Sequence, residues 1–176
     1  MTRAFLALGS NLGDRPTNLS EAVDLLDRRD GVVVVRSSRV YETAPVGPSQ
    51  PDDLNAVVEI GTSLSARTLL RTCLEVELAM GRERGQRWGP RVIDIDLLTF
   101  GDEEIDEPGL TVPHPRMHER GFVLIPLLEL VANPPLPGRR SIGELRLGPE
   151  MLGDVRPFAP PLTPRTDIGG PGRPVA

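Results

Sequence analysis

The order of apolar segments restricts the fold of this chain more than any other feature of the sequence. Four short apolar segments have the boundaries of strands, and the third alternates apolar and polar residues with a period of two. The predicted strands cover residues 2–9, 32–41, 54–62 and 92–100. One helical segment separates the first two strands, and another separates the last two. The order β-α-β-β-α-β predicts an α+β, ferredoxin-like fold, in which an antiparallel sheet carries helices on one face and a C-terminal extension follows.

Apolar residues recur at helical spacing in both segments between the strands. In the first, Asn18 and Glu21 are spaced as a capping box, and Gly31 is the expected stop. In the second, Ser65 opens the helix and Gly81 ends it. The apolar stripes are Leu19, Ala22, Val23 and Leu26 in the first helix and Leu69, Cys73, Val76 and Met80 in the second.

The remaining segments are less regular. A proline-rich loop is predicted for residues 42–51, and a helix interrupted or kinked by Pro126 is predicted for residues 121–132. Residues 1–147 are expected to form one domain. Residues 148–176 are rich in proline and glycine, and we expect a tail that is loosely draped from about Pro157 onward.

Composition excludes several classes of protein. All 20 basic residues are arginine, so a P-loop, which needs a lysine, is excluded. The formal net charge of −5 argues against a nucleic-acid-binding protein, and no apolar run is long enough to span a bilayer. Cys73 is the single cysteine, and the N-terminus does not resemble a signal peptide. We therefore expect a cytoplasmic protein with no membrane or nucleic-acid partner, and we expect it to be a monomer.

Two carboxylates distinguish the last predicted strand. Asp94 and Asp96 lie two residues apart, so both project from one face, while the apolar residues between and beside them point toward the helices. Exposed strand carboxylates often do no more than keep an open face soluble. At this spacing they are also placed to bind a pair of Mg²⁺ ions.

An arginine-rich loop precedes this strand. It contains Arg82, Arg84, Arg87 and Arg91 together with Gly85, Gly89 and Pro90. A run of charge commonly only solvates a loop. Like charges in a loop with few apolar anchors are nevertheless costly unless an anion neutralises them. Because guanidinium groups bind phosphate oxygens, arginines beside two carboxylates predict a site for a polyphosphate with its divalent metals. Trp88 is expected to anchor this loop on the sheet, and stacking on a ring substrate is the alternative.

Two further polar residues have a structural and a functional interpretation. His114 lies between two prolines that fix the direction of its ring, and it is either structural or a contact to phosphate. Asn55 lies on the polar face of the third strand, where its amide is either solvated or recognises the hydrogen-bonding edge of a heterocycle.

Five segments together resemble a known family. They are Gly-Ser-Asn-Leu-Gly-Asp at residues 9–14, Leu-Asn-Ala at 54–56, the arginine–aspartate block at 81–98, Val-Pro-His-Pro at 112–115 and Arg-Gly-Phe at 120–122. In order and spacing the chain resembles 6-hydroxymethyl-7,8-dihydropterin pyrophosphokinase of folate biosynthesis from about residue 3 to residue 129. The most specific part is Arg-Trp-Gly-Pro-Arg-x-x-Asp-x-Asp at residues 87–96.

The resemblance implies a ferredoxin-like enzyme that transfers a pyrophosphoryl group from ATP to the hydroxymethyl group of the pterin and releases AMP. It implies that Asp94 and Asp96 bind two Mg²⁺ ions and that Arg82 and Arg91 join them in catalysis. The implied nucleotide contacts are Glu77, Arg84, Trp88, Leu97, His114 and Arg120. The implied pterin contacts are Thr43, Ala44, Val46, Asn55 and Phe122, with Phe122 stacked on the ring.

Two other functions are compatible with the same topology. A non-catalytic ferredoxin-like module that binds a small ligand for regulation needs neither metal nor the arginine–aspartate arrangement. An RNA-binding sheet needs exposed aromatic residues and a basic face, which the 3% aromatic content and the net charge of −5 disfavour.

The chain departs from the family pattern at Asp53, at Gly109 and Pro115 near the expected nucleotide, and in the tail after Gly148. An aromatic residue usually precedes Leu54 and covers the second face of the pterin, whereas this chain has Asp53. Stacking on one face alone costs about 0.5–1.5 kcal/mol of binding free energy. We therefore expect Asp53→Tyr to bind the pterin more tightly in a calorimetric titration. Equal or weaker affinity would argue against this placement of Asp53.

Overall fold

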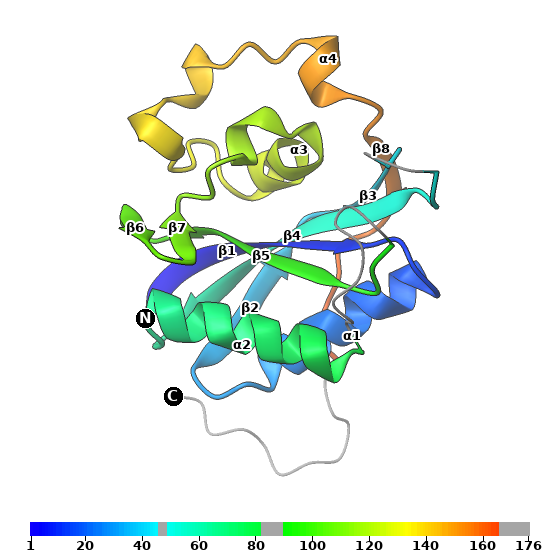
Figure 1. Ribbon diagram of the computed structural model, residues 1–176, viewed down its shortest axis with the longest axis vertical. Helices are drawn as coiled ribbons and strands as arrows, with labels where there is room; N and C mark the ends of the chain where they lie inside the picture. Colours follow the sequence, from blue (N-terminus) through cyan, green and yellow to red (C-terminus); the bar gives the residue numbers. More distant parts are fainter. Residues whose placement is uncertain (46–48, 82–89, 166–176) are drawn as a thin grey trace.

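An antiparallel sheet forms the centre of the structure (Figure 1). The structure is a computed structural model that describes residues 1–45, 49–81 and 90–165. Its strands are β1 (Thr2–Ser10), β2 (Val32–Ser37), β3 (Val40–Thr43), β4 (Asp53–Thr62), β5 (Asp94–Phe100) and β8 (Arg156–Ala159). They are ordered β5-β1-β4-β3-β8, and β2 also pairs with β4. β1 therefore lies between β4 and β5, so the predicted first, third and fourth strands are neighbours.

Two helices cover one face of this sheet, as predicted. They are α1 (Arg15–Asp27) and α2 (Ala66–Ala79) (Figure 1). Ser65 caps α2 by accepting a hydrogen bond from the backbone N–H of Thr68, and Gly81 follows the helix with a φ of 84°. Both ends of α2 thus agree with the sequence prediction.

The predicted start of α1 was wrong. The helix begins three residues before Asn18, because Asp14 is the N-cap and its Oδ1 accepts a hydrogen bond from Thr17 N at 3.2 Å. Asn18 lies inside the helix, and its side-chain amide donates to the carbonyl of Leu12 at 2.8 Å. The capping box with Glu21 is therefore not formed.

The predicted second strand is broken into β2 and β3. Ser38 lies at the break, where its N–H donates to Val57 O at 2.8 Å and its hydroxyl accepts from Val57 N at 2.9 Å. A bulge between Val34 and Arg36 already shifts the pairing of β2 with β4. The break and the bulge each insert residues opposite one continuous strand, which a run of valines does not reveal.

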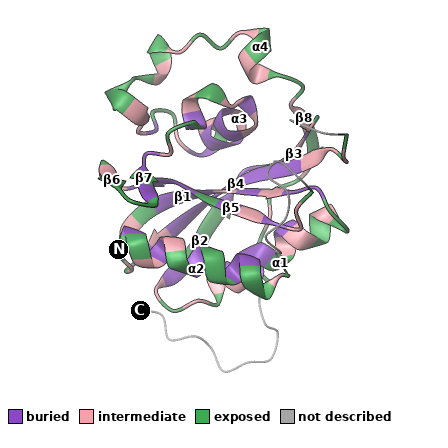
Figure 2. Ribbon diagram, viewed as in Figure 1, coloured by how far each residue is buried: buried purple, intermediate pink, exposed green. Residues whose placement is uncertain are grey.

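The helix predicted for residues 121–132, which the sequence did not assign to a face, lies on the opposite face of the sheet (Figure 1). It is α3 (Gly121–Leu130), and it continues through Pro126, which is buried. Phe5, Val57 and Leu98 of the sheet pack in a second apolar cluster with Met117, Val123, Leu124, Leu127, Leu130 and Leu136. These apolar strand residues belong to a cluster separate from the one that contains the apolar stripes of α1 and α2, so they need a cover of their own. Figure 2 shows buried residues in both the sheet and α3.

Shorter elements complete the described chain. They are the hairpin β6 (Ile105–Glu107) and β7 (Leu110–Val112), the 3₁₀ turns Met117–Glu119, Pro137–Arg139 and Ile142–Glu144, and the short helix α4 (Pro149–Leu152). Within the described residues, no helix has the length and apolar character needed to cross a lipid bilayer.

The C-terminal segment differs from the expected loose tail over the part that the structure describes. β8 pairs with β3, so that Pro157 lies opposite Tyr41 and Arg156 opposite Glu42. Farther on, the N–H of Arg165 donates to Asp24 Oδ1 at 2.7 Å. The expected loosely draped tail from Pro157 onward was therefore wrong for β8. Its backbone pairs with β3, which is distant in sequence. Residues 166–176 lie outside the described part of the chain.

The second apolar cluster should contribute substantially to stability. Leu124 is fully buried in it, so Leu124→Ala should lower the free energy of unfolding by about 3 kcal/mol in urea denaturation. Leu78→Ala on α2 is the matched control, because Leu78 is 67% exposed and should change stability by less than about 0.5 kcal/mol. Equal losses in the two variants would contradict the assignment of α3 to a second core.

Candidate active site

A cavity of about 630 Å³ opens on the second face of the sheet, beside the region covered by α3. This volume is typical of small-molecule sites. Its floor is the row in which Gly9 of β1 pairs with Asn55 on one side and with Asp94 on the other. A Cβ atom on Gly9 would lie 3.2 Å from Asn55 Oδ1, so the absence of a side chain there keeps the floor low between Asn55 and Asp94.

The two predicted aspartates both line this cavity. Asp94 and Asp96 alternate along β5 with Ile93, Ile95 and Leu97, which are buried in the core beneath α1 and α2. The prediction that the carboxylates leave the sheet on the side away from these two helices is confirmed. Asp94 also accepts a hydrogen bond from the guanidinium of Arg91, with Nη1 2.9 Å from Oδ1.

The start of β5 is held from below by a buried carboxylate. Glu77 of α2 is 2% exposed, and its Oε1 accepts a hydrogen bond from Ile95 N at 2.7 Å. This bond fixes the backbone between the two aspartates. Glu77 is not among the residues that line the cavity, and neither is Leu97, whose side chain lies in the core. The structure therefore does not bring these two residues to the site where nucleotide contacts were expected.

Asn11 joins three segments at one edge of the cavity. Its Oδ1 accepts a hydrogen bond from Arg91 N at 2.7 Å, and its N–H donates to Arg91 O at 3.1 Å. Its side-chain amide donates to Gln50 Oε1 at 2.9 Å. Asn11 and Gln50 line the cavity but were not predicted as site residues. The signal for Asn11 was its place in the motif at residues 9–14.

His114 lines the cavity near Asp96, and its ring is bonded to the backbone two residues farther along the chain. Burial lowers the pKa of its imidazole, and the nearby guanidinium groups of Arg120 and Arg116 add to this effect against the opposing influence of Asp96. His114 Nδ1 accepts a hydrogen bond from Arg116 N at 3.2 Å. A neutral ring with Nδ1 as acceptor carries its proton on Nε2, which makes His114 a hydrogen-bond donor through Nε2.

Four of the predicted pterin contacts also line the cavity. Asn55 is 7% exposed, and its side-chain amide donates to Thr43 Oγ1 at 2.8 Å. Ala44 and Phe122 line the same cavity, and the guanidinium of Arg120 lies 5.7 Å from the centre of the Phe122 ring. The structure thus brings Thr43, Ala44, Asn55 and Phe122 to one site with Arg91, Asp94, Asp96, His114 and Arg120. Val46, Arg82, Arg84 and Trp88 lie outside the described residues.

Several lining residues had no assigned role in the sequence analysis. They include Asn11, Gln50, Arg116, Glu119 and the segment 150–155. Asp53 also lines the cavity, as expected for the position from which an aromatic residue usually covers the pterin. Asp53 pairs with Thr43 across β3 and β4. Burial, followed by repulsion from Asp94 and Asp52, raises the pKa of Asp53 to about 6.

The carboxylates of the cavity fit a metal that arrives with a phosphate ligand. Among the described residues, no group of three or more His, Cys, Asp or Glu side chains is arranged to hold a metal ion. Asp94 and Asp96 supply two carboxylates on one face of β5. Mg²⁺ is commonly bound through one or two carboxylates, with substrate phosphates and water completing its coordination. The donor set therefore fits Mg²⁺ in complex with a polyphosphate.

The raised pKa of Asp53 predicts a pH-dependent change in stability. The folded protein binds the Asp53 proton more tightly than the unfolded chain between the ordinary pKa of 3.8 and about 6, so this group destabilises the fold as the pH rises through that interval. Asp53→Asn should raise the melting temperature near pH 7, and the gain should shrink toward about pH 4. Thermal unfolding followed by circular dichroism measures both. Asp106→Asn, at an exposed position of β6, is the control. A gain that does not depend on pH would contradict the raised pKa.

Comparisons with known proteins place the chain in a family. Residues 5–132 match the model of 7,8-dihydro-6-hydroxymethylpterin-pyrophosphokinase (HPPK). A 2-amino-4-hydroxy-6-hydroxymethyldihydropteridine pyrophosphokinase from Bacillus subtilis is 51% identical over 128 residues, which is 72% of this chain and 77% of the relative. A protein of the same name from Methylorubrum extorquens is 47% identical over 131 residues, or 74% of this chain and 83% of the relative.

Solved structures support the same fold. An HPPK-DHPS structure in complex with substrates has a TM-score of 0.59 at 14% identity, and a Plasmodium falciparum HPPK-DHPS triple mutant has a TM-score of 0.60 at 15% identity. The matches cover 73% and 74% of this chain but 40% of each of those chains, so the chain spans well under half of their length. At this identity they show the fold alone, which is the ferredoxin-like fold predicted. Because the family model matches most of this chain, the chain belongs to the HPPK family.

Proposed function

We propose that this protein is an ATP-dependent diphosphokinase of folate biosynthesis that transfers a pyrophosphoryl group from ATP to the hydroxymethyl group of 6-hydroxymethyl-7,8-dihydropterin and releases AMP. The observation that carries the proposal is the position of Asp94 and Asp96. They line one cavity together with a basic set of side chains and a set suited to a flat heterocycle. Membership of the HPPK family supports this activity and does not favour a non-catalytic regulatory module.

The nucleotide would occupy the part of the cavity with Arg91, His114 and Arg120. Guanidinium groups bind phosphate oxygens in a planar, charge-assisted geometry. The neutral imidazole of His114 adds an N–H donor without adding charge. Asp94 and Asp96 would hold two Mg²⁺ ions with the phosphates, and these ions would neutralise charge on the transferring group. Arg82, Arg84 and Trp88 are proposed to act on the nucleotide as well. Glu77 does not line the cavity, and its Oε1 accepts the N–H of Ile95, so we propose that it holds β5 in place instead of contacting the nucleotide.

The pterin would occupy the part of the cavity with Asn55, Thr43 and Phe122. The ring of Phe122 offers a stacking surface, and Asn55 offers both donor and acceptor groups to the edge of the heterocycle. The hydrogen bond from Asn55 to Thr43 fixes the orientation of the amide before the ligand binds. Ala44 and Val46 are proposed to complete this surface.

The reaction forms a bond between the hydroxymethyl oxygen and the β-phosphorus and breaks the bond between that phosphorus and the oxygen that bridges to the α-phosphorus. The electron pair of the broken bond leaves with AMP, and the hydroxyl proton is released. His114 Nδ1 already accepts the N–H of Arg116, so this nitrogen is not a base. The carboxylates of the cavity are the acceptors that the described lining offers for the proton. The cavity would act by orienting the two reactants for in-line transfer and by excluding water.

Three further expectations remain proposals. The number of Mg²⁺ ions is proposed to be two because the paired carboxylates and the phosphates together offer enough oxygen ligands. The protein is proposed to act as a monomer with ATP and the reduced pterin as its partners. A cytoplasmic location is proposed because ATP and reduced folate precursors are its substrates.

The proposed reaction is distinguished by its nucleotide product. With Mg-ATP and the reduced hydroxymethylpterin, chromatography should detect AMP, because the pyrophosphoryl group is transferred as a unit. Asp96→Asn should lower kcat by at least about 100-fold, since it removes a group that acts on the transferring phosphates. Asp106→Asn, which alters an exposed carboxylate outside the cavity, is the matched control.

Release of ADP would identify an ordinary kinase and overturn the proposal. Binding of the pterin without any nucleotide product would favour the regulatory module. Full activity of Asp96→Asn would show that the carboxylates have no role in the reaction.

A further inference from the structure

The C-terminal segment lies against the proposed pterin end of the cavity. Residues 150–155, which comprise most of α4 and its link to β8, line the cavity, although they lie beyond residues 5–132 over which the family is recognised. In Figure 1 this segment passes from the side of α3 to the edge of β3. Its position between these two elements is set by close contacts at both ends.

The first contact is a backbone approach that only glycine permits. A Cβ atom on Gly121 would lie 2.5 Å from Leu152 O and 2.7 Å from Leu152 Cα. The end of α4 is therefore packed directly on the first residue of α3. Phe122, the proposed stacking residue for the pterin, is the next residue along the chain. Phe122 and residues 150–155 line the same cavity.

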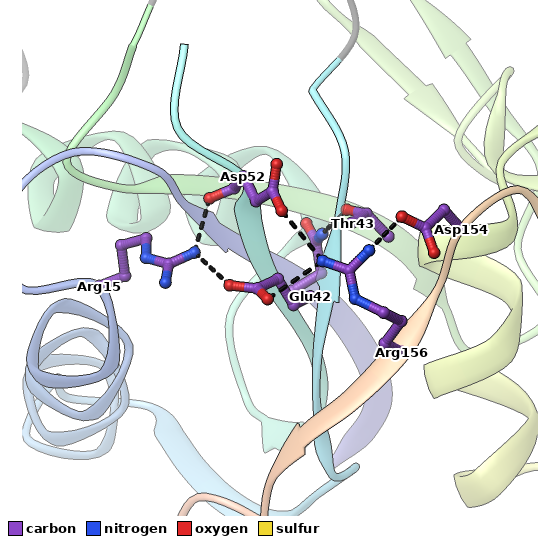
Figure 3. Close-up of polar contacts among 7 residues, drawn as sticks. Arg15, Glu42, Thr43, Asp52, Asp154 and Arg156 are labelled. Carbon is purple, nitrogen blue, oxygen red and sulfur yellow. Dashed lines mark hydrogen bonds and ion pairs between the residues drawn. The ribbon is translucent and has the colours of Figure 1, made fainter.

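The second contact is an ion-pair network around Arg156 (Figure 3). Arg156 Nη2 lies 3.1 Å from Glu42 Oε1 and 3.0 Å from Asp52 Oδ2, and Nη1 is paired with Asp154. Arg15 of α1 approaches the same loop ends, with Nη1 2.8 Å from both Glu42 Oε2 and Asp52 O. Two guanidinium groups therefore join three carboxylates. Such a network contributes more to stability than an isolated surface ion pair.

Arg156 binds two carboxylates, those of Glu42 and Asp52, that lie at the two ends of the loop between β3 and β4. Glu42 immediately precedes Thr43, and Asp52 immediately precedes Asp53. Thr43 and Asp53 pair with each other where β3 ends and β4 begins, and both line the cavity. Arg156 thus fixes both ends of the loop that connects β3 to β4. Hydrogen bonding from Arg15 and then Arg156 lowers the pKa of Glu42, so this carboxylate stays charged at neutral pH.

We propose that residues 150–155 form an outer wall of the acceptor-substrate subsite and that Arg156 is a positioning residue, which holds this wall and the ends of the 44–52 loop in place for the flat heterocycle. The inference rests on the proposed function in one respect, the identity of the heterocycle as a pterin. Arg156 itself does not line the cavity, so its effect must pass through Thr43, Asp53 and the wall. The nucleotide end, at Arg91 and His114, is held by Asn11 and by the backbone of Arg116 instead.

The test is a separation of the two substrates in steady-state kinetics. Arg156→Gln in the full chain should raise KM for the hydroxymethylpterin about tenfold and change KM for ATP by less than about twofold, because misplacement of one subsite wall affects one reactant. Calorimetric titration of the pterin in the presence of a non-hydrolysable ATP analogue should show the same loss in Kd. Arg156→Lys, which keeps the charge but not the planar fork, should recover part of the affinity.

Arg67→Gln is the matched control. The Arg67 side chain is 46% exposed against 42% for Arg156, and it also pairs with a carboxylate, Glu107, at 2.9 Å, but it lies outside the cavity lining. This variant should leave both KM values unchanged. Should Arg156→Gln fail to fold, as judged by circular dichroism, Glu42→Gln provides the second variant, and a smaller selective rise in KM for the pterin is expected.

The outcomes separate this inference from the proposed function. AMP production by the unaltered protein, with Arg156→Gln showing unchanged KM and Kd for the pterin, would overturn the inference and leave the function intact. Equal rises in both KM values would also overturn it, because they would indicate general loosening of the fold. If the unaltered protein released no AMP, the function would fail, and a selective loss of pterin affinity in Arg156→Gln would still support the wall. Absence of pterin binding in the unaltered protein would overturn both.

Discussion

The alternation of side chains along β5 is the constraint on which the site depends. Ile93, Ile95 and Leu97 are buried beneath α1 and α2, so Asp94 and Asp96 must leave the sheet on the other face. A slip of one residue would exchange the two sets and place two carboxylates in an apolar core. The hydrogen bond from Ile95 N to the buried carboxylate of Glu77 adds a second restraint on the same backbone. The core and the site are therefore specified by the same seven-residue strand.

One end of the second face of the sheet packs in an apolar core, and the other end lines the cavity. At one end, Phe5, Val57 and Leu98 are covered by α3 and contribute to a second apolar cluster. At the other end, Gly9, Asn55 and Asp94 form the floor of the cavity. α3 links the two, since its interior packs on the cluster while Phe122 at its start reaches the cavity. The helix that completes the fold thereby supplies one wall of the site.

Local patterns in the sequence were sufficient to predict the elements whose signals lie within one short segment. The period of two in β5 placed the aspartates correctly, and Ser65 and Gly81 marked the ends of α2. Where two local signals competed, the prediction failed: Asn18 and Glu21 fit a capping box, but Asp14 is the actual N-cap of α1. A choice between two such caps is decided by packing of the helix on the sheet, which a short window of sequence does not contain.

Contacts between distant segments account for what the sequence did not show. Arg156 pairs with Glu42, which is 114 residues away, and β8 adds to the edge of β3. Over the described residues 148–165 the elements are short, α4 and β8, but the proline and glycine content of the tail did not indicate that residues 150–155 reach the cavity. Nor did periodicity reveal that α3 covers the second face, because an almost uniformly apolar helix has no polar side to orient it. The resemblance to a family named nine of the residues that line the cavity, which no local pattern could bring together because they are distant in sequence.

The central claim is that Asp94 and Asp96 hold divalent ions together with the phosphates of ATP. Binding of Mn²⁺, followed by electron paramagnetic resonance with and without a non-hydrolysable ATP analogue, tests it most directly. The account predicts weak binding to the protein alone, tight binding of two ions when the analogue is present, and loss of that tight binding in Asp94→Asn and Asp96→Asn. Tight binding without the nucleotide, or unchanged binding in both variants, would contradict it.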